Sequence, residues 1–292
     1  MNEIAVILVH WKDRNQTKIC LEKVLTWSRI KPIIYLVQNE QSEDQFAEYT
    51  GINSILSERN LGYGGGNNLG LKQAIHQARY SLLLNTDASI DEAEVELLIE
   101  TMKSNATIFS TGPVLEEYSE DNARLYYGGR DIATHLNTRM EVDDAGIISK
   151  SPVWIKVDYT IGTILLLDNR KLESVGLFDT DYFFSGEVAD LCYRASRAGY
   201  LPTTSINAVG KHMLDNVNKR NTMYKYYNLR NRGLYIVKHK LGFNKLASWW
   251  IYAAKDTLYF VLKGRRQEAK SSYLALIHMI LGSYGNKNKE FQ

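Results

Sequence analysis

The segment YSLLLNTD, residues 80–87, places a run of apolar residues directly before a polar turn. Tyr80 to Leu84 is typical of a strand buried on both faces of a sheet, and Asn85-Thr86-Asp87 follows it. In open α/β sheets, ligands bind at the carboxyl ends of the strands. A carboxylate there suits a divalent cation, which prefers oxygen ligands. Taken alone, Asp87 fits an acid in a turn or helix cap at least as well.

Strands and helices alternate on both sides of this segment. The predicted strands are 4–9, 32–37, 80–84 and 161–167, and the predicted helices are 19–27, 68–79, 91–102 and 187–198. This rhythm predicts an α/β fold, with one Rossmann-like core, a central, mostly parallel sheet and helices on both faces. Residues 116–151 have a weaker pattern that indicates loops and short strands, and residues 286–292 are expected to form a polar tail.

The composition is that of a globular protein. Of 292 residues, 45% are hydrophobic and 23% are charged, which argues against disorder. The two cysteines form no CxxC pair, which favours a reducing compartment. The first residues lack the pattern of a secretion signal, and no apolar stretch is long enough to span a membrane, so we expect a cytoplasmic protein. A net charge of only +2 argues against a nucleic-acid binder.

That small net charge is the sum of two unequal parts. Residues 211–292 contain 16 Lys and Arg and four acidic residues, a net charge of +12, whereas residues 1–210 carry a net charge of −10. The basic part is also rich in Trp and Tyr. It is predicted to be a helical, basic, aromatic-rich extension, either with a solvated basic face packed on the core or docked peripherally on the inner face of the membrane.

The segment RNLGYGGGNNLG, residues 59–70, has four glycines in five positions. Such a cluster allows close approach of the backbone to a ligand, and the free N–H groups of a helix beginning after it favour an anion. Neither GxGxxG nor GxxxxGK is complete, so the dinucleotide and P-loop motifs are absent. A flexible connecting loop is an equally good interpretation.

The segment FFSGEVADLCYR, residues 183–194, carries two acids near the start of a predicted helix. Glu187 and Asp190 are three residues apart and share one face, where a carboxylate is able to accept the proton of an attacking hydroxyl. They also fit ordinary first-turn acids, with Arg194 as the i+4 partner of Asp190. His212 follows 22 residues later; a single histidine is more often packed than a ligand, but an imidazole is able to complete a metal site.

In this order, the segments resemble the family 2 inverting glycosyltransferases of GT-A fold, especially rhamnosyltransferase-like members, over residues 4–231. The resemblance rests on His10-Trp11 after the first strand, Val37-Gln38-Asn39 with Ser42 and Asp44 in place of DNxSxD, the loop from Asn60, Asn85-Thr86-Asp87 in place of NPD, Gly162-Thr163 with Val175 to Asp179, Glu187 to Arg194 in place of EDxDLCxR, and Tyr226 to Asn231 as YYxxRN. Gln38 replaces the usual Asp of its motif.

The resemblance implies a set of site residues. Nucleotide-sugar contacts are expected from His10, Trp11, Asn39, Arg59, Asn60, Gly62, Tyr63, Asn67, Asn68, Asn85, Asp87 and Arg230, acceptor-side contacts from Gly162, Thr163 and Phe184, and Mg²⁺ or Mn²⁺ ligands from Asp87 and His212. It also implies a GT-A domain over 1–231, with a nucleotide-sugar-binding half (1–105) and an acceptor-side half (106–231), followed by the extension at 232–292.

One position departs from the family pattern. Val188 stands where the family has the Asp that acts as general base, and a valine side chain accepts no proton. We therefore expect Glu187 to be the base, with Asp190 as second choice, or else a silent protein that only binds sugar nucleotides. A sugar nucleotidyltransferase is disfavoured, because no glycine-rich triphosphate loop follows the first strand.

The implied reaction moves rhamnose or a hexose, with inversion, from dTDP-rhamnose or a UDP-sugar. The implied acceptor is a glycan or a polyprenyl-diphosphate-linked glycan in bacterial surface polysaccharide synthesis.

Overall fold

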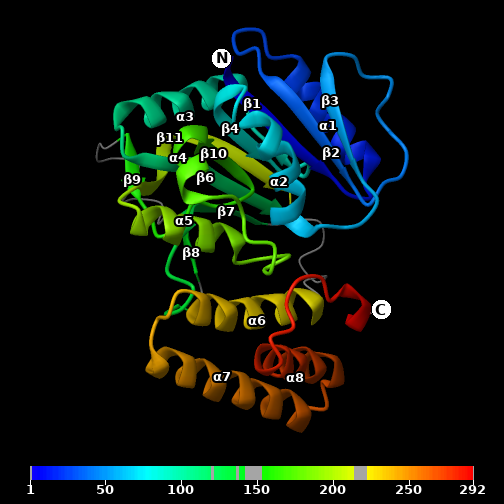
Figure 1. Ribbon diagram of the computed structural model, residues 1–292, viewed down its shortest axis with the longest axis vertical. Helices are drawn as coiled ribbons and strands as arrows, with labels where there is room; N and C mark the ends of the chain where they lie inside the picture. The colour runs from blue at the N-terminus through cyan, green and yellow to red at the C-terminus, as the bar shows by residue number, and fades with distance from the viewer. Residues whose placement is uncertain (1, 120–121, 136–137, 142–152, 214–221, 292) are drawn as a thin grey trace.

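The structure is a computed structural model that describes residues 2–119, 122–135, 138–141, 153–213 and 222–291. Figure 1 shows a sheet domain with a helical bundle beneath it. The strands are β1 (Asn2–His10), β2 (Ile33–Asn39), β3 (Ile52–Ser57), β4 (Ala78–Leu84), β5 (Ala88–Ser89), β6 (Ile108–Ser119), β7 (Asn122–Gly129), β8 (Arg139–Glu141), β9 (Trp154–Lys156), β10 (Ile164–Asp168) and β11 (Leu201–Met213). The helices are α1 (Arg14–Leu25), α2 (Gly62–Ala74), α3 (Glu92–Ser104), α4 (Asn169–Val175), α5 (Glu187–Arg197), α6 (Thr222–Lys238), α7 (Phe243–Leu262) and α8 (Arg266–Ile280), with a 3₁₀ turn η2 (Asn288–Phe291).

The described strands form one sheet in the order β3-β2-β1-β4-β10-β6-β11-β5, and β7, β8 and β9 branch from it. Strands β3, β2, β1 and β4 are parallel, as are β6 and β11, whereas β10 lies antiparallel between β4 and β6. The α/β fold with a central, mostly parallel sheet is therefore confirmed. The chain order reverses between β1 and β4, so a crevice is expected at their carboxyl ends.

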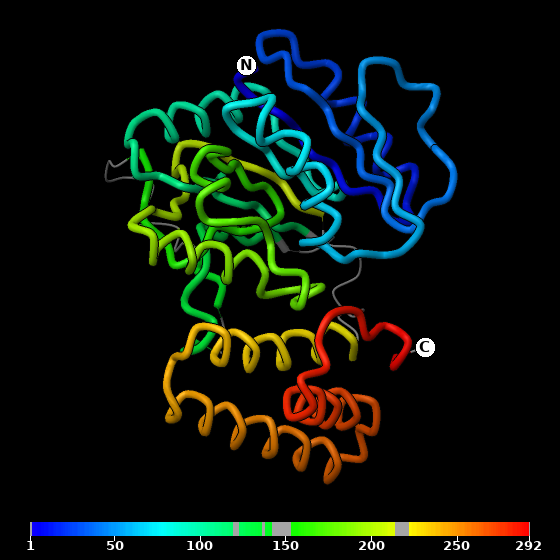
Figure 2. Tube along the Cα trace, viewed as in Figure 1, coloured from blue at the N-terminus to red at the C-terminus, as the bar shows by residue number. Residues whose placement is uncertain are grey.

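Helices cover both faces of the sheet, as predicted. On one face, α1 and α3 pack their apolar residues against Val6, Leu8 and Leu82, and on the other, α2, α4 and α5 pack against Ile7, Leu83 and Leu165. Both sets of strand residues are buried, which is the reason for the continuous apolar runs in the sequence. The tube in Figure 2 follows the same layers.

Two predicted elements have different bounds. The helix expected at 68–79 is α2, which begins at Gly62 and ends at Ala74, so the glycines lie inside the helix and not before it. The strand expected at 161–167 begins at Ile164. Gly162 and Thr163 form a turn instead, because their carbonyls accept from Tyr63 and Asn85 and not from a neighbouring strand.

The C-terminal region is helical, as predicted, and α6, α7 and α8 pack around their own apolar cluster. The expected boundary at 231/232 falls inside α6, which begins at Thr222 and contributes to the same cluster as Tyr182 and Phe183. The expected polar tail is packed: Phe291 contacts the ring of Tyr226. None of the helices in the described residues is long and apolar enough to cross a membrane.

Candidate active site

The polar segment after β4 lies where the sheet order reverses. The N–H of Asn85 donates to the carbonyl of Thr163 at 3.0 Å, which joins this segment to the turn before β10. Beyond it, β5 pairs with the end of β11, with Ala88 opposite His212. The pairing brings Asp87 and His212 together, although 125 positions separate them in the sequence, as the metal-ligand prediction requires.

His212 lies between two carboxylates. Its Nε2 is 3.2 Å from Oδ2 of Asp87, and its Nδ1 is 3.0 Å from Oε1 of Glu117 on β6. Glu117 is buried and also binds Arg139. Burial opposes protonation of His212, but hydrogen bonds to Asp87 and Glu117 outweigh it and raise its pKa to about 9. The sequence did not single out Glu117 or Arg139, because only the β6–β11 register places Glu117 beside His212.

One oxygen of Asp87 is free to bind a ligand. Oδ1 is buried and has no hydrogen-bond partner within the described residues, which is unusual for a carboxylate. The unpartnered carboxylate oxygen is a suitable donor for Mg²⁺ or Mn²⁺, and Nε2 of His212 would join it by giving up the proton that it shares with Asp87. In the described part of the chain, no group of three His, Cys, Asp or Glu side chains is placed to hold a metal by itself.

The glycines of α2 serve close packing. A Cβ on Gly66 would lie 2.9 Å from Cγ1 of Val9, and one on Gly70 would lie 2.6 Å from Cγ2 of Ile7. Both distances are shorter than ordinary contacts, so glycine lets α2 approach β1 closely. Gly64 to Gly66 are buried within α2, so the expectation that the helix begins after the glycine cluster is corrected.

Asparagines fix the start of α2. Asn39 accepts from the N–H of Leu61 at 2.9 Å, and its Nδ2 donates to Oδ1 of Asn60 at 3.3 Å. Asn68 both donates to and accepts from the backbone of Phe178, which ties α2 to the segment before α5. The side chains expected to contact nucleotide are thus divided. Asn39, Asn67 and Asn68 are buried in protein hydrogen bonds, whereas Trp11, Arg59, Asn60, Tyr63 and Asn85 are at least partly accessible.

His10 is fully buried at the end of β1. Its Nδ1 is 2.8 Å from Thr17 and its Nε2 is 3.3 Å from Gln45, so it orders the loop after β1. Gln38, at the position where the resembling family has Asp, binds Asp44, Ser54 and the N–H of Gln45. These contacts fix the loop beside Trp11, which is exposed and donates to Glu40.

Val188 points toward the candidate site. A Cβ on Gly162 would lie 2.8 Å from Cγ2 of Val188 and 3.0 Å from the hydroxyl of Tyr63, which itself donates to the Gly162 carbonyl at 2.6 Å. Gly162 adjoins Thr163, the partner of Asn85. The residue at the usual base position therefore has an apolar side chain beside the Asn85 segment.

Glu187 is 4% exposed, and its Oε2 has no hydrogen-bond partner within the described residues. Burial raises its pKa to about 7, although N–H groups at the start of α5 partly offset the shift. A carboxyl with a pKa near neutral is suited to general base catalysis. Asp190 is less suited to this role, because it binds Arg194 and Tyr182 and lies 2.9 Å from His239. Burial opposes its ionisation, but His239 and Arg194 lower its pKa.

Arg230 is fully buried, which corrects the expectation of a nucleotide contact. Its guanidinium donates to the carbonyls of Asp181, Tyr182 and Gly285. The neighbouring Asn231 donates to the carbonyls of Tyr182, Phe184 and Ser185. In this loop Phe183 and Ser185 have φ of 62° and 68°, which non-glycine residues rarely adopt. Arg230 and Asn231 thus hold a strained loop that leads to Glu187 and leaves Phe184 partly exposed.

No protein-family model matches the chain. Among curated proteins, it is 23% identical over 249 residues to the low-salt glycan biosynthesis hexosyltransferase Agl10 of Haloferax volcanii, covering 80% of this chain and 75% of that protein. Among solved structures, it is similar to GalNAc-T7 with UDP, GalNAc and Mn²⁺ (TM-score 0.64, 13% identity, 81% of this chain and 48% of that one). It is also similar to the mannosyltransferase PcManGT of Pyrobaculum calidifontis with GDP-Man and Mn²⁺ (TM-score 0.61, 11% identity, 97% of this chain and 88% of that one). A third similar structure is S. aureus TarS (TM-score 0.55, 12% identity, 80% of this chain and 40% of that one).

These similarities define the class of fold. The sheet domain has the glycosyltransferase GT-A type of fold, with the helical bundle appended to it. The chain spans about half the length of GalNAc-T7 and about two fifths of TarS, but most of PcManGT.

Proposed function

We propose that the protein is a metal-dependent inverting glycosyltransferase that uses a nucleoside-diphosphate sugar. The observation that carries the proposal is Oδ1 of Asp87, which lies beside His212 at the carboxyl ends of β4 and β11 and has no partner in the described part of the chain. This arrangement suits a diphosphate bound through a divalent cation. The similarity to a hexosyltransferase, and to GT-A structures with UDP and GDP-Man, supports the same chemistry.

The accessible side chains around this crevice fit a nucleotide. We propose that the exposed Trp11 ring, which has Lys12 Nζ 4.3 Å from its centroid, stacks on a base, and that the charge of Arg59 attracts phosphate. The donor belongs to the nucleoside-diphosphate hexoses or 6-deoxyhexoses, with dTDP-rhamnose and UDP-hexoses as the leading members. The acceptor is a glycan hydroxyl, on a polyprenyl-diphosphate-linked chain in a bacterial surface polysaccharide.

In the reaction, an acceptor hydroxyl oxygen forms a bond to the anomeric carbon while the bond to the diphosphate oxygen breaks. Asp87 and His212 would hold the cation, which would supply positive charge to stabilise the leaving diphosphate. Glu187 accepts the hydroxyl proton on the opposite face of the sugar, because its raised pKa makes it a proton acceptor near neutral pH. The side chain of Val188 lies against Gly162, which adjoins Thr163 and so borders the Asn85 segment.

A second function, donor binding without transfer, is favoured by two observations. Val188 is unable to act as a base, and Glu187 is nearly inaccessible. A nucleotide-release assay with candidate donors, with and without Mn²⁺, separates the two. Metal-dependent nucleotide release supports the transferase, whereas a metal-dependent rise in melting temperature with no release, even with lipid-linked acceptors, supports the binding protein.

A further inference from the structure

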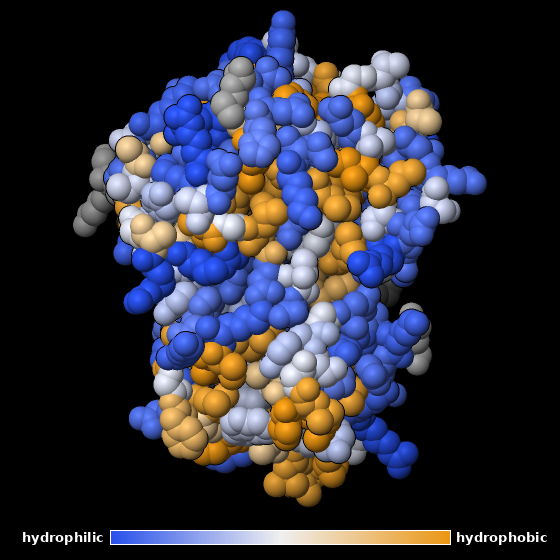
Figure 3. All heavy atoms as spheres, in the orientation of Figure 1, coloured by the Kyte–Doolittle hydropathy of each residue, from blue (hydrophilic) through white to orange (hydrophobic). Residues whose placement is uncertain are grey.

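The outer side of the helical bundle exposes an apolar stripe. On α7, Ile251, Leu258 and Leu262 are 56%, 57% and 77% exposed, and their spacing of seven and four residues puts them on one face. Across from them, α8 exposes Tyr273 and ends in the exposed pair Ile280 and Leu281. Figure 3 shows orange side chains gathered at this lower end of the molecule. Exposed apolar side chains in such a contiguous group mark an interaction surface.

Basic residues surround this stripe. Lys255 lies within it, Lys263 and Arg265 follow in the turn between α7 and α8, and Arg266 and Lys270 lie in the first turns of α8. Of the acidic residues nearby, Glu268 is paired with Arg265, and the backbone carbonyl of Glu290 accepts from Lys270. Asp256 faces inward, where it binds Lys225 and Ser272. The exposed face therefore combines apolar and aromatic side chains with positive charge, the combination found in helices that lie in a membrane interface.

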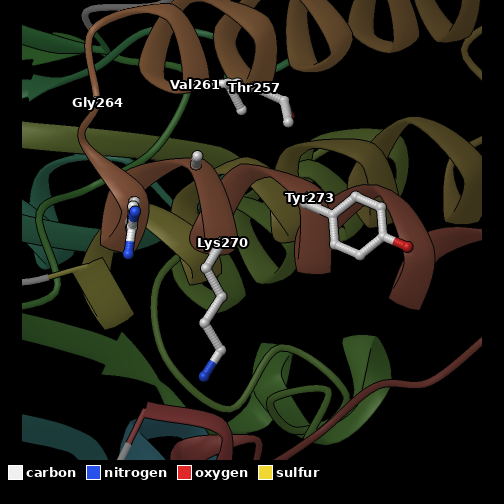
Figure 4. Close-up of a pocket in the computed structure, with 7 residues that line it drawn as sticks. Thr257, Val261, Gly264, Lys270 and Tyr273 are labelled. Carbon is white, nitrogen blue, oxygen red and sulfur yellow. The ribbon is translucent and has the colours of Figure 1, made fainter.

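A groove runs between the two helices on this side. It has a volume of about 590 Å³, with Thr257 and Val261 on α7 across from Lys270 and Tyr273 on α8. Figure 4 shows Lys270 and Tyr273 projecting from the same side of α8. Apolar walls with cations at the rim suit an acyl chain and its phosphate headgroup.

The inner face of α7 is held in place. Trp249 and Ala253 are buried, and the indole N–H of Trp249 donates to the carbonyl of Leu229 on α6 at 2.9 Å. Since its inner face is packed against α6 and α8, α7 exposes its outer face to a partner without any rearrangement of the bundle. Figure 1 shows α6 between the sheet domain and α7.

We propose that the outer face of α7 and α8 docks the protein on a bilayer rich in anionic phospholipid. Charge complementarity selects this occupant over a second copy of the chain, because a twofold contact through this face would bring the same cations together. Helix layers are about 8–10 Å apart, so docking would hold the crevice near the membrane surface. The benefit of holding the crevice near the membrane rests on the proposed function, because a lipid-linked acceptor lies at the membrane surface. The docking itself does not depend on the proposed function.

The test is co-sedimentation of the full chain with vesicles. Wild type is expected to bind vesicles of phosphatidylglycerol and phosphatidylcholine, to bind pure phosphatidylcholine much more weakly, and to lose affinity as salt rises. Leu258→Glu with Leu262→Glu should weaken binding at least about tenfold. Lys263→Glu with Arg266→Glu should also weaken it at least about tenfold, because each Lys or Arg near an anionic surface contributes about fivefold to the affinity.

Matched controls are available on the sheet domain. Ile19→Glu changes an apolar residue of similar exposure (69%) on α1, and Lys31→Glu with Lys156→Glu makes the same net charge change. Both should bind vesicles like wild type. The proposal is overturned if wild type ignores anionic vesicles, if the controls lose binding equally, or if light scattering shows a dimer that Leu258→Glu with Leu262→Glu dissociates. Donor binding, measured on the same variants, reports on the proposed function separately.

Discussion

Nε2 of His212 lies 3.2 Å from Oδ2 of Asp87, whose other oxygen is buried and has no hydrogen-bond partner among the residues that the structure describes. The contact joins the end of β4 to the end of β11. Glu117 accepts from the opposite side of the imidazole and so fixes its orientation. A histidine held in this way presents a defined face to a ligand of Asp87, as in many metal sites.

Asp87→Asn is expected to remove metal-dependent donor binding. The amide replaces the charge that attracts a divalent cation, so affinity for UDP in the presence of Mn²⁺ should fall at least about 100-fold by calorimetry. Asp91→Asn is the matched control, since this acid lies four positions later and pairs with Lys23 on the surface. Equal UDP affinity of Asp87→Asn and wild type in Mn²⁺ would show that Asp87 is not a ligand.

Glu187→Gln is expected to change stability and turnover together. The unfolded chain releases this proton near pH 4.5, whereas the folded protein holds it to about pH 7. The free energy of unfolding therefore falls as pH rises through that window and stays lower above it. The amide has no proton to lose, so the variant should match wild type below pH 4.5 and exceed it at pH 8, by up to about 3 kcal/mol in urea unfolding.

The same variant should lower turnover by about 100-fold or more if Glu187 is the base. Glu100→Gln, at an exposed position of α3, is the control for both measurements. Unchanged turnover with increased stability at pH 8 would assign Glu187 a structural role and favour the binding protein.

The sequence predicted what depends on local pattern. Continuous apolar runs identified β1, β2 and β4, and Asp87 was found because a polar turn follows such a run. The start of α2 was missed, since glycine is a poor helix former and its use there depends on close tertiary contacts, such as those with Ile7, Val9 and Phe178. Glu117 was missed for a related reason: its role depends on a strand register that brings distant residues together.

Buried polar residues were the other source of error. Arg230 resembles a phosphate ligand in sequence, because nothing local indicates that its guanidinium will be enclosed by backbone carbonyls. In sequence, Asp190 likewise resembles a candidate general base. The structure instead places it beside His239 of the bundle. Arg230 connects α6 to the loop before α5, and Asp190 connects α5 to His239; sequence patterns reveal neither connection.

Asn231→Leu is expected to release the loop between Asp181 and Glu187. The change removes donors to three carbonyls while keeping a similar volume, and the loop then loses the contacts that offset its left-handed residues. A loss of about 2–4 kcal/mol is expected, because buried unpaired carbonyls are costly. Asn53→Leu, which removes a single bond to Ile34 on the edge of the sheet, should cost about 1 kcal/mol or less. Similar losses in urea unfolding for the two variants would contradict the role of Asn231.

Gly70→Ala separates two explanations of the glycines in α2. If glycine were only tolerated in this helix, alanine would stabilise it by about 1 kcal/mol. The structure predicts the opposite sign, a loss of about 1–3 kcal/mol, because the new Cβ would lie 2.6 Å from Cγ2 of Ile7. Ile7→Ala removes that atom and is destabilising by itself, by about 2–5 kcal/mol. In the Ile7→Ala background, Gly70→Ala should become neutral or stabilising. The double variant should therefore lose less stability than the sum of the two single losses. Additive losses in urea unfolding would mean that contact with β1 is not the reason for glycine at this position.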